Sequence, residues 1–149
     1  MDTKILSGKD VSTTTYQALQ SRIKVLKSQS VVPGLAVLLV GEDAGSQIYV
    51  RNKTKKFADL SLHSNTFQYS SSISQEDLLL KIRELNNDDR FHGILVQLPL
   101  PKHIDEYKVL RAIDPKKDVD GFHPFNLGLL AAGKPYFIPC TPKGIMRIL

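Results

Sequence analysis

Cysteine and long apolar runs are what this 149-residue sequence has least of. Its one cysteine, Cys140, cannot form an internal disulfide framework, and a single thiol is typical of a protein kept in a reducing compartment. The longest apolar run, Leu35–Val40, is far too short to cross a bilayer, and the chain does not open with a basic segment followed by an apolar one. We therefore expect a cytoplasmic protein that has no membrane partner.

A glycine-rich nucleotide-binding signature is also missing. None of the nine glycines forms a Gly-x-Gly-x-x-Gly pattern, so the chain offers no obvious turn to hold a dinucleotide pyrophosphate at a helix N-terminus. These 149 residues are therefore not expected to bind NADP. The composition, with 42% hydrophobic and 23% charged residues, is globular, and the length suits one core-forming domain.

Apolar periodicity predicts an alternation of helices and strands. Helices are expected to open at Ser7 or Asp10, to span Asp43 to about Leu62, and to open at Ser74; strands are expected at Leu35–Val40, at about Ser64–Tyr69 and at Ile94–Val96. This order is that of an α/β fold with a mostly parallel sheet and helices on both faces. After Pro101 the chain is expected to be irregular, with a short helix near Asn126 and a final helix that starts at Thr141.

Gln97 stands at the end of the third expected strand. Pro99 and Pro101 cannot donate ladder hydrogen bonds, so the strand should stop and leave an extended, stiff segment. The carboxyl ends of strands in open α/β sheets are where ligands bind. Gln97 is the one polar side chain among apolar and proline neighbours there, which makes it a candidate site residue.

The helix from Asp43 has two notable stripes. The stripe expected to face the sheet consists of Val50, Thr54, Phe57 and Ala58. The adjacent stripe consists of Ser46, Tyr49 and Lys53. Tyr49 and Lys53 are four residues apart, so an aromatic plane and an ammonium can contact the same ligand. From spacing alone, a solvated helix face with a boundary tyrosine is the more common explanation. Lys55 is expected to point to solvent.

Four separated motifs together resemble one protein family. They are Tyr49–Lys53, Gly93–Pro101, Lys117–Pro124 and Pro139–Pro142. In this order they resemble the catalytic domain of the bifunctional methylenetetrahydrofolate dehydrogenase/methenyltetrahydrofolate cyclohydrolase, the FolD family, over nearly the whole chain. The resemblance implies one-carbon interconversion of tetrahydrofolates that serves purine biosynthesis. The implied reactions are hydrolysis of 5,10-methenyltetrahydrofolate to 10-formyltetrahydrofolate and NADP-dependent oxidation of 5,10-methylenetetrahydrofolate.

The same resemblance implies roles for individual residues. Lys53 would be the catalytic lysine, with Gln97 as its support. The implied folate-binding groups are Tyr49, which would stack on the ring system, Asp120, which would bind the pterin, and the main chain of Val96 and Leu98, which would complete the floor of the pocket. These roles are chemically consistent, because a flat heteroaromatic ring favours aromatic stacking and a pterin edge carries N–H donors for a carboxylate.

The resemblance also implies a domain organisation. Residues 1–140 would form the tetrahydrofolate-binding catalytic domain. Residues 141–149 would begin a truncated linker helix to an NAD(P)-binding Rossmann domain that this sequence lacks. Tetrahydrofolate derivatives would be the substrates, NADP would be the cofactor of the longer enzyme, and a homodimer is implied.

Other types of site fit the sequence less well. A calcium loop at Asp118-x-Asp120 is disfavoured because Leu127 stands where a bidentate glutamate should be, and no metal site is expected. A nucleophilic Cys140 is disfavoured by the prolines around it. The net charge of +5 favours anionic partners, but only Arg51–Lys56 concentrates basic residues, so nucleic acid is not expected as a partner. The rival function is a non-catalytic folate-binding or scaffolding domain, in which Lys53 would be idle.

Overall fold

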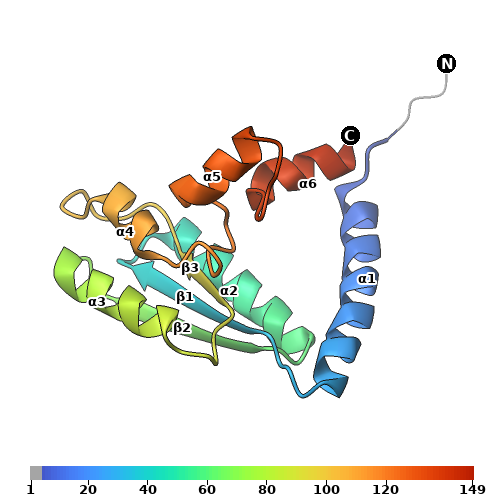
Figure 1. The fold of residues 1–149 in the computed structure, drawn as a ribbon, viewed down its shortest axis with the longest axis horizontal. Helices are drawn as coiled ribbons and strands as arrows, with labels where there is room; N and C mark the ends of the chain where they lie inside the picture. The colour runs from blue at the N-terminus through green and yellow to red at the C-terminus, as the bar shows by residue number, and fades with distance from the viewer. Residues whose placement is uncertain (1–4) are drawn as a thin grey trace.

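The computed structural model describes residues 5–149, which form a three-stranded parallel sheet with helices around it (Figure 1). In chain order the elements are α1 (Gly8–Ser28), β1 (Gly34–Val40), α2 (Ala44–Asp59), β2 (His63–Tyr69), α3 (Gln75–Asn86), β3 (Gly93–Val96), α4 (Glu106–Ala112), α5 (Pro124–Ala131) and α6 (Cys140–Ile148). The predicted α/β class is confirmed. Residues 1–4 of the domain expected over 1–140 lie outside the described residues.

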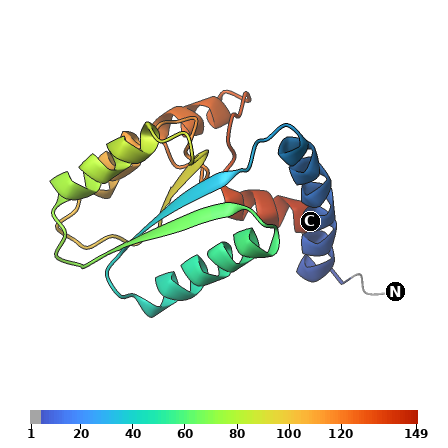
Figure 2. The same ribbon diagram turned by 90° about the horizontal axis from the view of Figure 1, so that it is seen from below.

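Strand β1 is the centre of the sheet. The strand order is β2-β1-β3, and both neighbours pair with β1 in parallel. Figure 2 shows α2 on one side of the sheet and α3 with α4 on the other. All residues of β1 are buried, as the unbroken apolar run predicts for a strand that is covered on both faces.

The two faces of β1 have separate cores. Because successive side chains alternate in direction, Leu35, Val37 and Leu39 pack with Val50 of α2 and with Leu95. On the opposite face the packed residues are Ala36, Leu38 and Val40 of β1, Leu78, Ile82 and Leu85 of α3, and Val109 of α4. Each layer of helices is therefore fixed to the same strand.

The predicted helix starts are confirmed by their capping contacts. Ser7 accepts a hydrogen bond from the main-chain N–H of Asp10 and Asp43 accepts one from Ser46, at 3.2 and 2.7 Å. Ser74 accepts one from Asp77 at 3.1 Å and donates its hydroxyl to the Asp77 carboxylate at 2.7 Å. These side chains satisfy N–H groups that have no partner within the helix, so a short local pattern is enough to set the start of each helix.

Helix α1 lies beside the rest of the fold, next to α6 (Figures 1 and 2). Only Ile23 of its apolar stripe is buried, and Leu19 is exposed. Arg147 of α6 donates to the Thr15 hydroxyl of α1 at 3.2 Å, so these two helices are in contact. Within residues 5–149, no helix has the length and apolar character needed to cross a membrane.

Four predictions about the secondary-structure elements were wrong. Helix α2 ends at Asp59 instead of near Leu62, and Ala58 is exposed instead of facing the sheet. The chain after Pro101 is not irregular throughout, because α4 follows, with Asp105 as its N-cap. Helix α6 begins at Cys140, one residue before the predicted start. A seven-residue helix such as α4 contains too few turns for periodicity to reveal it.

Gly34 opens β1 at a point where another segment crosses closely. Its N–H donates to His92 Nδ1 at 3.1 Å, and its carbonyl oxygen accepts the N–H of His92 at 2.8 Å. A Cβ atom at Gly34 would collide with the main-chain oxygen of Arg90. The absence of a side chain is therefore a packing requirement at this position.

Gly34→Ala should lower the free energy of unfolding by about 1–3 kcal/mol, the usual cost of forcing extra volume into a packed core. The matched control is Gly128→Ala in α5, where an added Cβ meets no described atom within 4 Å. That variant should gain about 0.5–1 kcal/mol, because alanine is the better helix former. Denaturant unfolding of the two variants beside the parent measures both effects. Equal stability of Gly34→Ala and the parent would contradict the close approach.

Candidate functional site

Lys53 and Gln97 meet at the carboxyl ends of the strands. The ammonium of Lys53, on α2, donates to Gln97 Oε1 at 3.3 Å, although the two residues are 44 positions apart. Gln97 directly follows β3, and its main-chain N–H donates to Leu38 O of β1 at 2.9 Å. Its side-chain amide donates to Leu98 O at 2.8 Å, which leaves the amide oxygen directed at Lys53. The contact therefore links α2 to the end of the sheet.

Asp120 lies close enough to this pair to interact with it electrostatically. The pKa of Asp120 is raised, mainly by burial; the positive charge of Lys53 opposes the shift and the negative charge of Asp118 adds to it. Among residues 5–149, no donor forms a hydrogen bond with the Asp120 carboxylate. The site thus holds an ammonium, an amide and a partly buried carboxylate with free acceptor oxygens. We call Lys53, Gln97 and Asp120 the site cluster.

The turn that carries Asp120 is built on Asp118. The Asp118 carboxylate is buried and accepts the main-chain N–H groups of Gly121, Phe122 and His123 at 3.1, 3.3 and 2.8 Å. The main chain of Asp118 also forms a parallel bridge with Ile94 of β3. Asp120 is therefore held between two anchored parts of one loop.

The outer edge of β3 faces this loop. Ile94 donates its N–H to Lys117 O at 2.7 Å, away from β1. Main-chain groups two residues apart in a strand point to the same side, so the N–H and C=O of Val96 point toward the loop that carries Asp120. The carbonyl of Leu98 already accepts the amide of Gln97 and the hydroxyl of Ser46, at 2.8 and 3.5 Å. Of the two predicted main-chain contributors, Leu98 therefore has its carbonyl occupied within residues 5–149, whereas Val96 lies on the edge of β3 that faces the loop.

Tyr49 lies one helical turn before Lys53 on α2. The residue is 65% exposed, in contrast to Ser46 on the same stripe, which is buried. Residues four apart on a helix are neighbours on its surface, so the phenol ring and the ammonium lie on the same side of α2. Tyr49 is thus available to a ligand that contacts the site cluster.

Cys140 is a site neighbour whose position the sequence did not predict. Its thiol donates to Val119 O at 3.5 Å. The pKa of Cys140 is raised, first by burial and then by the charge of Asp120, while Lys143 and Lys53 oppose the shift. In the sequence, only the place of Cys140 in the motif Pro139–Pro142 could have indicated that it lies next to the site cluster. Ser46 and Asn126 were missed as well, because a serine or asparagine in a loop or on a helix carries no signal by itself.

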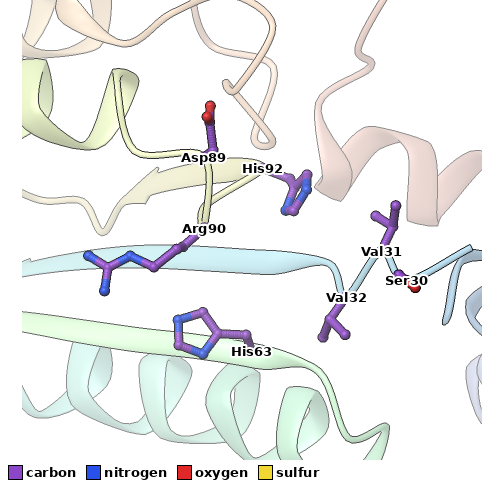
Figure 3. A pocket seen from close by; sticks show the side chains of 7 residues that line it. All are labelled: Ser30, Val31, Val32, His63, Asp89, Arg90 and His92. Carbon is purple, nitrogen blue, oxygen red and sulfur yellow. The ribbon is translucent and has the colours of Figure 1, made fainter.

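A hollow of about 410 Å³ lies at the opposite end of the sheet (Figure 3). It is lined by Ser30, Val31, Val32, His63, Asp89, Arg90 and His92. Figure 3 shows the Arg90 side chain pointing away from Val31, and Arg90 instead pairs with Asp88, holding the pKa of that carboxyl at about 2. The hollow contains none of the predicted site residues. The side chains that could bind a ligand or transfer a proton, which form the site cluster, lie instead at the carboxyl ends of the strands.

Comparison with known families gives one clear match. The model of the tetrahydrofolate dehydrogenase/cyclohydrolase catalytic domain matches residues 6–120. Among curated relatives, the bifunctional protein FolD of Enterococcus faecalis is 53% identical over 144 residues, which are 97% of this chain and 51% of the relative. That of Acetivibrio thermocellus is 48% identical over 149 residues, which are 100% of this chain and 52% of the relative. The chain thus spans about half the length of these relatives.

Solved structures of FolD enzymes resemble this chain over nearly its whole length and match it with about half of their own. The bifunctional FolD enzyme of Campylobacter jejuni superimposes with a TM-score of 0.94 at 44% identity, over 98% of this chain and 52% of that one. The FolD of Trypanosoma brucei, solved with NADP cofactor and an inhibitor, has a TM-score of 0.94 at 32% identity, over 100% of this chain and 52% of that one.

Asp120→Asn should stabilise the folded protein at neutral pH. Because the pKa of Asp120 is raised, the folded chain binds this proton more tightly than the unfolded chain, and stability falls as pH rises through that range. Asparagine cannot ionise and avoids this cost. The gain in free energy of unfolding should be present above the raised pKa and should disappear as pH falls below the ordinary pKa of aspartate.

Urea unfolding between pH 7 and pH 3 measures this difference. The matched control is Asp89→Asn, an exposed aspartate at the far end of the sheet, which should change stability little at any pH. If Asp120→Asn is less stable than the parent at pH 7, the carboxylate is stabilised by its surroundings and the electrostatic description of the site is wrong.

Proposed function

The chain belongs to the tetrahydrofolate dehydrogenase/cyclohydrolase family, and we propose that it binds a reduced folate beside the site cluster and hydrolyses 5,10-methenyltetrahydrofolate to 10-formyltetrahydrofolate. The observation that carries this proposal is the 3.3 Å hydrogen bond between Lys53 and Gln97 next to Asp120. A positioned ammonium, with an acceptor to hold it and a carboxylate nearby, suits proton transfer as well as binding.

Three groups would recognise the folate ring system. Tyr49 offers an exposed aromatic face with few rotors to freeze, so it would stack on the pterin. The unpaired oxygens of Asp120 would accept hydrogen bonds from the pterin N–H groups. The main chain of Val96 would supply a further donor and acceptor at the edge of β3. These contacts would fix the orientation of the ring relative to Lys53.

The hydrolytic step needs proton transfers that Lys53 is placed to perform. Water adds to the methenyl carbon between N5 and N10, forming a C–O bond and releasing a proton. The bond from that carbon to N5 then breaks, N5 takes up a proton, and the hydroxyl on the carbon loses its proton to solvent, so that a neutral formyl group remains on N10. Lys53 would move protons between the reacting groups: its ammonium can give a proton to N5, and the amine that this leaves can take up the proton released by the water. Gln97 would hold Nζ in place by accepting its N–H at 3.3 Å.

The oxidation of 5,10-methylenetetrahydrofolate belongs to the same proposal for a protein as long as the curated relatives. NADP would supply the hydride acceptor in that reaction. The turn from β1 to α2 does not fit its pyrophosphate, because the Asp43 carboxylate already accepts the N–H of Ser46 at 2.7 Å at the start of α2. We therefore assign no hydride-transfer step to residues 5–149.

Domain organisation and partners rest on the family resemblance. We propose that residues 1–140 form the folate-binding domain and that 141–149 begin the helix leading to an NAD(P)-binding domain. We further propose a homodimer in the cytoplasm that serves purine biosynthesis.

Lys53→Met should abolish most cyclohydrolase activity. Methionine keeps much of the length and the apolar stem but cannot carry a proton, so turnover should fall by about 10²–10⁴-fold while the folate still binds. The matched control is Lys55→Met, on an exposed position of the same helix, which should be nearly silent. Gln97→Ala should lie between the two, because Gln97 only positions the ammonium.

Turnover and folate affinity of the three variants are measured side by side, with folding checked by circular dichroism. Near-normal turnover in Lys53→Met would remove Lys53 from the chemistry. If the parent itself binds folate without turnover, the rival function, a folate-binding or scaffolding domain, is correct.

A further inference from the structure

We propose that Asp118 is a positioning residue for folate recognition, acting through Asp120. In this arrangement the buried Asp118 carboxylate, together with Asn126, holds the turn that presents Asp120 to the ligand. The inference rests on the proposed function, because it takes Asp120 as the carboxylate that binds the pterin. Asp118 itself would not touch the folate.

Asp118 is a buried charge that the loop surrounds with donors. The residue is 2% exposed, and both carboxylate oxygens accept hydrogen bonds. Oδ1 accepts the N–H groups of Gly121 and Phe122, and Oδ2 accepts that of His123 and the side-chain amide of Asn126 at 2.8 Å. Among residues 5–149, no lysine, arginine or histidine forms an ion pair with it. The charge is therefore balanced by N–H groups of the turn, which must stay in place to satisfy it.

Asn126 closes this network from the other side. It is fully buried, and its amide nitrogen donates both to Asp118 Oδ2 and to Pro115 O, at 2.8 and 2.9 Å. Its Oδ1 accepts no hydrogen bond from the described residues, so the orientation of the amide is set by its two donor contacts. Asn126 thus connects the segment before Asp118 to the turn after it.

The main chain around Asp120 is fixed on both sides as a result. Before it, Asp118 is bridged to Ile94 of β3; after it, three consecutive N–H groups are bound to the Asp118 carboxylate. Gly121 adopts a φ of 73°, and a Cβ there would approach Pro139 N to 3.0 Å, so the turn is also confined sterically. The two aspartates therefore have different roles. The carboxylate of Asp118 accepts hydrogen bonds from the protein itself, and the carboxylate of Asp120 remains able to accept hydrogen bonds from a ligand.

A double-mutant cycle on tetrahydrofolate affinity tests this division. The variants are Asp118→Asn, Asp120→Ala and the double variant, with binding measured by calorimetry and folding by circular dichroism. Asp120→Ala should weaken binding by about 5- to 150-fold, the effect of leaving pterin donors unpaired. Asp118→Asn should weaken it measurably but by no more than this, because its amide would face N–H groups and let the turn move. The double variant should bind like Asp120→Ala alone, because Asp118 acts only through Asp120.

Two further variants separate positioning from general stability. Asp105→Asn replaces an exposed aspartate that caps α4 through the N–H of Lys108, and it should leave folate affinity unchanged. Asn126→Ala removes one donor to Asp118 and keeps the carboxylate, so it provides the same test if Asp118→Asn does not fold. It should weaken binding in the parent and have no effect in the Asp120→Ala background.

The possible results distinguish this inference from the proposed function. Additive losses in the cycle, or unchanged affinity in both Asp118→Asn and Asn126→Ala, would overturn the positioning role and leave the folate site standing. Unchanged affinity in Asp120→Ala would overturn both, because no pterin-binding carboxylate would then exist for Asp118 to position.

Discussion

The hydrogen bond between Lys53 and Gln97 is the interaction on which the site depends. This hydrogen bond forms only if two elements are correctly placed on β1. Helix α2 packs on one face of β1 through Val50, and the residue after β3, Gln97, donates its main-chain N–H to Leu38 of β1. Strand β1 is buried on both faces and cannot shift without disturbing both cores. The position of the ammonium relative to the amide is therefore a consequence of how one central strand is packed.

The loop between α4 and α5 adds the carboxylate by a different physical means. It has no regular structure around Asp120, and its shape comes from one buried charge, Asp118, that gathers the N–H groups of the turn. A charged group that is fully hydrogen-bonded inside a protein is costly to disturb, which makes a loop rigid without a helix or strand. The site thus combines a lysine on a helix, an amide at a strand end and a carboxylate on a pinned turn.

What the sequence could predict was local. The buried strand β1 and the starts of α1, α2 and α3 follow from apolar runs and capping residues, which act within a few positions. The meeting of Lys53 with Gln97 was predicted only through the family resemblance, because nothing in helical spacing refers to a residue 44 positions away. The part played by Asn126 could not be predicted, since it depends on contacts with Pro115 and Asp118 that form only when the loop folds. Short elements such as α4 were missed for lack of periodicity.

The most direct test of the account is the rate at which the protein hydrolyses 5,10-methenyltetrahydrofolate, followed by the loss of its absorbance. A site that joins a positioned lysine to the proposed folate-binding groups predicts a rate above the spontaneous one that rises in proportion to protein concentration and saturates with substrate. Saturable binding of the same compound at the spontaneous rate would contradict the account. The cluster of Lys53, Gln97 and Asp120 would then be a binding surface without chemistry.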